Sequence, residues 1–132
     1  MPHVMPTPRE LQALKVLWRV QRATVRDLYH ELAPDEGELA YTTVLSLLQT
    51  MEQKGLVGRE SQGKAHVYFP KLARERTCQL LAGSFLDQVF DGAMGEYVCR
   101  ALESRPPSYE ELEELEKLIA QAKRAARKGG KG

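Results

Sequence analysis

The sequence has almost no net charge and no long apolar segment. Its 19 Lys and Arg nearly balance its 18 Asp and Glu, which gives a formal net charge of +1. No apolar run approaches the roughly 20 residues that a membrane-spanning helix needs. The first ten residues also lack the basic and apolar regions of a secretory signal. We therefore expect a cytoplasmic protein without membrane insertion.

The small net charge limits the ways in which the chain can bind nucleic acid. Residues 1–80 contain 11 basic and 9 acidic residues, whereas residues 81–132 contain 8 and 9. A nucleic-acid binder with this balance has to place its cations locally, and a second copy of the chain would double their number.

Signatures of catalysis and of metal binding are missing as well. The sequence has no glycine-rich phosphate loop, no GxSxG motif and no cluster with metal-ligand spacing. Cys78 and Cys99 form no CxxC pair, and His3, His30 and His66 are scattered. We expect a protein that is not an enzyme and holds no cofactor or metal, with both cysteines reduced and mostly buried. A thiol-responsive regulator remains an alternative, because the two cysteines fall on different predicted helices.

Residues that begin and end helices are plentiful, and they predict three short helices. The segment "TPRE" at 7–10 combines an N-cap, a first-turn proline and a capping-box glutamate, so a helix begins there and runs to about residue 20. Thr24 caps the second helix, and Pro34 and Gly37 indicate a loop after it. The third helix ends at Gly55, because glycine adopts the left-handed conformation at little cost.

After this third helix the apolar residues no longer recur at helical spacing, and the new pattern predicts a β-hairpin. Residues 56–70 have a short apolar start, a polar tip at 62–64 and the strand-forming segment "AHVYF". Three helices and a hairpin match the winged helix-turn-helix, in which the third helix enters the DNA major groove and the wing reaches the backbone. The predicted fold class is mainly α with a small two-stranded wing, followed by further helices.

The third helix, "AYTTVLSLLQTMEQKGLV", has an outer face without acidic residues. Its inner stripe consists of Val44, Leu47, Leu48 and Met51. Its outer arc consists of Thr42, Thr43, Ser46, Gln49, Thr50 and Gln53. Threonine and serine are poor choices for an exposed helix interior, whereas hydroxyls and amides bind phosphates and base edges. We interpret the arc as a DNA-reading face; a neutral solvated face or a protein interface remains open.

Basic and polar residues around this helix are the candidates for contacts with the DNA backbone. Lys54 closes the third helix, and Arg59, Lys64 and His66 lie on or beside the hairpin. Arg9 and Thr24 lie near the starts of the first two helices, as does Arg26. As a set around a winged helix, these residues favour phosphate contact.

The segments "LQALKVLWRVQRATVRDLYHEL", "LAYTTVLSLLQTMEQKGLVGRE" and "GKAHVYFP", in this order, closely resemble the penicillinase-repressor family. This is the BlaI/MecI/CopY group of bacterial transcriptional repressors. The resemblance spans about residues 7–122. It implies a homodimer that binds a dyad-symmetric operator in double-stranded DNA and blocks transcription of a resistance-type, β-lactamase-like gene.

The resemblance also implies roles for particular residues. The recognition-helix positions would be Tyr41, Thr42, Thr43, Ser46 and Gln49, with Lys64 as a wing contact. The expected domains are a winged helix at 1–71, a helical dimerisation module at 72–128 and a disordered tail at 129–132. The expected dimer core is Leu81, Phe85, Leu86, Val89, Phe90, Val98, Leu102, Leu112, Leu115, Leu118 and Ile119.

The chain departs from two branches of that family. In staphylococcal members induction by a membrane sensor protease involves cleavage at an Asn-Phe bond, and the matching position here is Arg100-Ala101. This difference argues against induction by the same protease. The copper-responsive branch has a CxC…CxC tail, which this chain lacks. A protein-interaction module remains an alternative function, because the acidic "EELEELE" helix could dock a partner.

Overall fold

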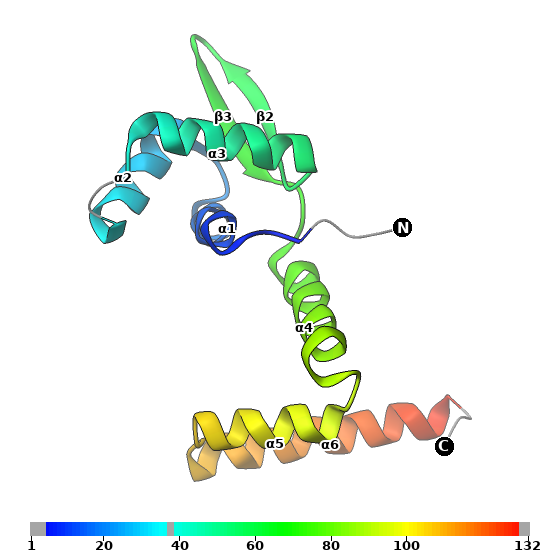
Figure 1. The fold of residues 1–132 in the computed structure, drawn as a ribbon. Coiled ribbons are helices and arrows are strands. Elements are labelled where there is room, and N and C mark those ends of the chain that lie inside the picture. Colours follow the sequence, from blue (N-terminus) through cyan, green and yellow to red (C-terminus); the bar gives the residue numbers. More distant parts are fainter. Residues whose placement is uncertain (1–4, 37–38, 130–132) are drawn as a thin grey trace. The chain divides into compact units, whose positions relative to one another are not determined.

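The computed structural model describes residues 5–36 and 39–129, and the chain forms two compact units, Met1–Ser84 and Phe85–Gly132. The first unit contains three helices, α1 (Pro8–Val20), α2 (Val25–Glu36) and α3 (Tyr41–Lys54), and three strands, β1 (Ala23–Thr24), β2 (Val57–Gln62) and β3 (Ala65–Pro70). Figure 1 shows the β2–β3 hairpin projecting beyond α3. This arrangement is a winged helix-turn-helix, as predicted.

The sheet of the first unit has the order β1-β3-β2, and all of its pairs are antiparallel. The strands β2 and β3 form the predicted wing. They are joined by the two-residue turn Gly63-Lys64, where Gly63 has a positive φ of 62°, as the first position of a type II′ hairpin turn requires. The strand β1 was not predicted: its two residues pair with Val67 and Tyr68.

The core of the first unit lies between the three helices and the inner end of the wing. Its fully buried side chains include Leu14 and Leu17 of α1, Leu28 of α2, and Tyr68 of β3. Trp18 ties α1 to the segment after the wing, because its indole Nε1–H donates to the carbonyl oxygen of Leu72 at 2.9 Å. The helices therefore hold the hairpin by packing, and the Trp18 hydrogen bond fixes the segment that follows it.

Two of the predicted helix ends are confirmed and a third is wrong. Thr7 and Glu10 form the capping box that begins α1, and Gly55 ends α3 with φ of 82°. We expected a loop from Pro34, but α2 continues through Pro34 to Glu36. The fixed φ of proline is compatible with the helix, although proline cannot donate the usual hydrogen bond to the carbonyl four residues earlier. Gly37 lies outside the described residues.

The helix α4 (Arg74–Phe90) leads from the first unit into the second, which also contains α5 (Met94–Ser104) and α6 (Tyr109–Lys128). Phe85, Phe90 and Tyr97 form an aromatic cluster with ring centroids 5.3–6.0 Å apart. No residue of α5 or α6 is buried. Among its described residues, 85–129, the second unit of a single copy therefore has no buried core.

The cysteines differ from the expectation of burial. Cys78 and Cys99 are free thiols and both are exposed, because α4 and α5 bury few of their residues in a single chain. The tail was expected to begin at residue 129; Gly129 caps α6, and residues 130–132 lie outside the described part. Within the described residues, no helix is both long and apolar enough to cross a membrane, and no cluster of metal-ligating side chains occurs.

Candidate nucleic-acid interface

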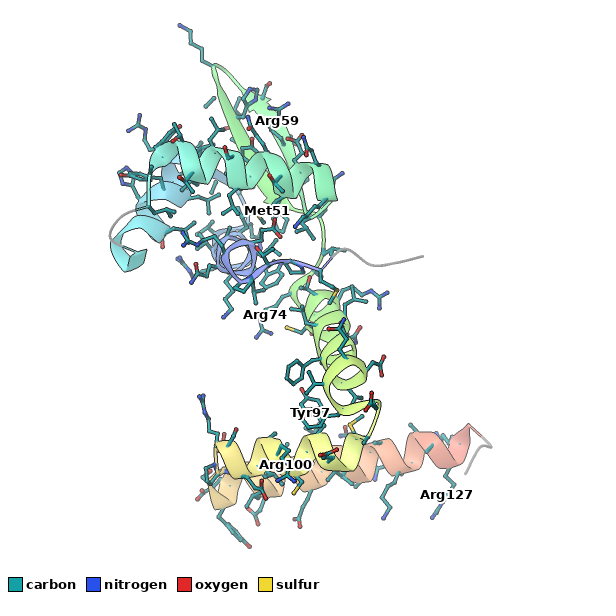
Figure 2. All side chains as sticks on the ribbon, in the orientation of Figure 1. Met51, Arg59, Arg74, Tyr97, Arg100 and Arg127 are labelled. Atoms are coloured by element: carbon teal, nitrogen blue, oxygen red, sulfur yellow. The ribbon has the colours of Figure 1, made fainter. Side chains whose placement is uncertain are left out.

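The two faces of α3 are arranged as its sequence predicts. Val44, Leu48 and Met51 are completely buried, and Figure 2 shows Met51 pointing from α3 toward α1. All six residues of the outer arc, from Thr42 to Gln53, are exposed. The unit therefore presents hydroxyl and amide groups to solvent along one side of a rigid helix.

The N-terminus of α3 adds backbone donors to this face. The N-cap residue is Ala40, no side chain caps this end, and the first turn contains no acidic residue. The Thr43 N–H donates to the Ala40 carbonyl oxygen at 3.0 Å, whereas the amides of Tyr41 and Thr42, in the first two positions of the helix, have no intrahelical acceptor and carry a partial positive charge. Together with the hydroxyls of Thr42 and Thr43, they can bind a phosphate oxygen.

An open groove of about 600 Å³ separates α3 from the wing. Its lining residues are Thr24, Val25, Arg26, Tyr41, Leu45, Gln49, Arg59, Lys64, Ala65, His66 and Tyr68. The structure thus brings together seven predicted contact residues from five elements and a turn. Arg26, Arg59 and Lys64 give this lining three cations, and none of the lining residues is acidic. The electrostatics therefore favour a polyanion along the groove.

Two of these lining residues are held in place by neighbours. The Thr24 hydroxyl accepts from the Asp27 backbone N–H, and Asp27 Oδ2 accepts from the Thr24 N–H, both at 3.1 Å. The Tyr41 ring packs edge-on against the Tyr29 ring at 5.8 Å. The start of α2 and the start of α3 therefore have fixed positions along the groove.

The wing carries two cations and is braced at its inner end. Lys64 occupies the exposed turn, and Arg59 lies beside α3 (Figure 2) with its Nε 3.7 Å from Glu52 Oε2. That separation between an exposed guanidinium and a partly buried carboxylate makes a weak ion pair, so Arg59 can turn to a phosphate. Arg22 bonds Glu60 and lies over the Phe69 ring, 5.8 Å from its centroid.

Lys54 has an intramolecular partner that the sequence did not indicate. Its Nζ donates to both carboxylate oxygens of Glu10 at 2.9 Å. Glu10 is 2% exposed, whereas the Lys54 side chain is 29% exposed. Glu10 was interpreted only as a capping-box residue, and its Oε1 does accept from the Thr7 N–H at 2.9 Å. A phosphate contact by Lys54 therefore competes with a buried carboxylate.

Other predicted site residues lie outside the groove. Arg9 is partly buried in the first turn of α1. Arg100 and Ala101 are exposed in the middle of α5, where Arg100 pairs with Glu103 at 2.7 Å. Of the expected dimer residues, Phe85, Val89, Val98, Leu112, Leu115, Leu118 and Ile119 are exposed, while Leu81, Leu86, Phe90 and Leu102 are partly buried.

The fold and this face define a winged helix-turn-helix protein of the DNA-binding class. A family model described as penicillinase repressor matches residues 6–121. The chain therefore belongs to the penicillinase repressor family and is a DNA-binding transcriptional repressor. The penicillinase repressor of Bacillus licheniformis is 25% identical over 114 residues, which cover 86% of this chain and 88% of that relative.

Other similar proteins match mainly over about half of the chain. The transcriptional regulator BlaI of Mycobacterium tuberculosis is 39% identical over 72 residues, 54% of this chain and 49% of that protein. The solution structure of the DNA-binding domain of the repressor BlaI has 21% identity and a TM-score of 0.49, covering 55% of this chain and 90% of that one. The CopR repressor structure has 30% identity and a TM-score of 0.45, and the match covers 54% of this chain and 99% of that one.

Proposed function

We propose that the protein is a homodimeric repressor that binds a dyad-symmetric operator and blocks transcription of a resistance-type, β-lactamase-like gene. The groove between α3 and the wing carries this proposal, because cations and hydrogen-bonding groups line it without a carboxylate. In the proposed complex α3 lies in the major groove, and the wing with Lys64 lies along the backbone.

The second part of the proposal is that residues 1–71 bind DNA and residues 72–128 form the dimer. Large apolar side chains stay exposed on α4, α5 and α6 of a single chain, and exposed apolar surface of this kind is typical of an interface. A two-fold pairing would place two α3 helices in successive major grooves of one operator. The bound dimer would then cover the promoter.

Two substitutions test the DNA-binding part. An operator is first selected from a random duplex library, and binding to it and to a scrambled duplex is measured by fluorescence anisotropy across a salt series. Thr43→Ala should weaken operator binding by about 1–3 kcal/mol, because a base contact is lost, and should change random-duplex binding much less. Lys64→Ala should weaken binding to both duplexes. It should also reduce the salt slope, which is the slope of the logarithm of the binding constant against the logarithm of the salt concentration, by about one unit.

The matched control for Lys64→Ala is Lys15→Ala, because Lys15 is exposed on α1 and does not line the groove. Equal losses on both duplexes for Thr43→Ala would contradict base reading by α3. The dimer is tested separately by sedimentation velocity of the intact chain, and a monomer at micromolar concentration would contradict the dimeric part of the proposal.

If a membrane sensor protease regulates the protein, Arg100-Ala101 is the bond that matches the family's cleavage position, although its residues differ from the Asn-Phe pair. Proteases cut extended backbone, and this bond lies in the middle of an eleven-residue helix. Cleavage there would therefore need local unwinding of α5.

A further inference from the structure

The charges of α6 are completely separated along its length. All five of its carboxylates lie in residues 110–116, and all five of its cations lie in residues 117–128. The helix dipole favours acidic groups in the first turn and basic groups in the last. It does not account for the inner charges, such as Glu116 and Lys123, which lie more than one turn from either end.

This separation is unfavourable in an isolated helix. Residues three or four positions apart are neighbours on a helix surface, and like charges at that spacing repel. Glu110 has Glu113 and Glu114 at these spacings, and Arg124 has Arg127 and Lys128. Within the described residues the ion pair recorded inside α6 is Lys117–Glu114, at 3.1 Å. Apart from this pair at the junction, the acidic residues 110–116 and the basic residues 123–128 have neighbours of their own sign.

The apolar stripe of α6 is also uneven along its length. Residues 112, 115, 119, 122 and 126 are apolar with alternating spacings of three and four, as in a coiled-coil seam. The acidic half contributes leucines, and the basic half contributes Ala122 and Ala126. These positions are exposed, and Leu118 and Ile119 beside the centre are each 58% exposed.

A second α6 in the opposite direction complements both features. It would place the acidic residues 110–116 of one helix against the basic residues 117–128 of the other, with the two-fold axis near Ile119. The leucines at 112 and 115 would then pack against the alanines at 122 and 126. A parallel pair would oppose like charges and leave the alanine layers underfilled. The helix α5 offers mixed signs (Glu96, Arg100, Glu103) and does not match the two halves.

We propose that α6 pairs with the α6 of a second copy in antiparallel orientation. The proposal rests on the proposed homodimer and specifies how one of its surfaces is used. Glu116 and Lys123 flank the stripe on the same side, one heptad apart. In an antiparallel pair, Glu116 of one copy lies opposite the partner's Lys123, and the two-fold axis repeats this contact.

The helix direction can be measured by double electron–electron resonance on the full-length chain. Spin labels are placed singly by Glu114→Cys, Gln121→Cys or Lys128→Cys in a Cys78→Ser/Cys99→Ser background. These three sites share one heptad position, so their lateral offsets match. With Glu116 opposite the partner's Lys123, antiparallel pairing predicts axial separations between copies of about 17, 5 and 26 Å, at about 1.5 Å per residue. Equal separations at all three sites would overturn the proposal.

A charge exchange provides a second test without labels. Lys123→Glu should raise the dimer dissociation constant by about tenfold, because two attractive contacts become repulsive. Adding Glu116→Lys should restore it. In a parallel pair Lys123 has no such partner, so neither change should follow. A chain that dimerises but fails both tests refutes the antiparallel pairing alone, whereas a monomeric wild-type chain refutes the homodimer itself.

Discussion

The ion pair between Lys54 and Glu10 gives a sharp prediction about the stability of the first unit. Lys54→Met removes the ammonium group and leaves a carboxylate that is 2% exposed and keeps one recorded donor, the Thr7 N–H. Breaking a fully buried ion pair costs about 3–5 kcal/mol. Because the Lys54 side chain is 29% exposed, water can reach the carboxylate from that side, and we expect a loss of about 2–4 kcal/mol.

The double-mutant cycle separates the ion pair from other effects of the substitutions. Glu10→Gln keeps an amide oxygen for the Thr7 N–H and removes the charge. Glu10→Gln/Lys54→Met should therefore recover most of the stability that Lys54→Met loses, with a coupling energy of about 1–3 kcal/mol. Additive losses would show that the two side chains do not depend on each other.

Urea denaturation of the full chain, followed by tryptophan fluorescence, measures these changes. Trp18 is the single tryptophan, and its hydrogen bond to Leu72 places the probe in the first unit. All variants are compared at one protein concentration, since dimer formation adds to apparent stability. A Lys54→Met variant within about 0.5 kcal/mol of wild type would refute the reasoning. A salt slope unchanged by Lys54→Met would further contradict its predicted phosphate contact.

Two further substitutions test how the wing is held. Gly58→Ala should destabilise the first unit by about 1–3 kcal/mol in thermal denaturation, because a Cβ there would lie 2.5 Å from the Phe69 ring. The control is Gly83→Ala, because a Cβ at Gly83 has no neighbouring atom within 4 Å. Equal effects of the two substitutions would contradict the clash. Trp18→Phe should cost about 1 kcal/mol in denaturation followed by circular dichroism, because it leaves the Leu72 carbonyl without its indole donor; no loss would contradict that role.

The sequence predicted best the features that depend on short spacings. The buried stripe and exposed arc of α3 follow from one helical period, and Gly55 ends the helix because of its own backbone preference. The strand β1 was missed because two residues cannot show a strand period, and its pairing with Val67 and Tyr68 depends on chain segments far apart in sequence.

Contacts between distant residues explain the other differences. Glu10 and Lys54 are separated by 44 positions. From the local sequence Glu10 was interpreted as a capping residue and Lys54 as a surface cation, so nothing indicated that the two side chains meet. The expected burial of Cys78 and Cys99 failed for another reason. An apolar stripe predicts that a helix packs against something, but it does not say whether the partner surface belongs to the same chain.

The near-zero net charge and the groove together explain why a single copy would bind DNA weakly. If Arg26, Arg59 and Lys64 each neutralise one phosphate, the salt slope of one chain is about −2.7, and that of a pair is about −5.4. A fourfold rise in salt would then lower affinity by about 40-fold for one chain and by about 1,800-fold for a pair. The same arithmetic means that a dimer gains its affinity from holding two winged units on one duplex. Separating the chains would therefore release the operator without altering α3 or the wing.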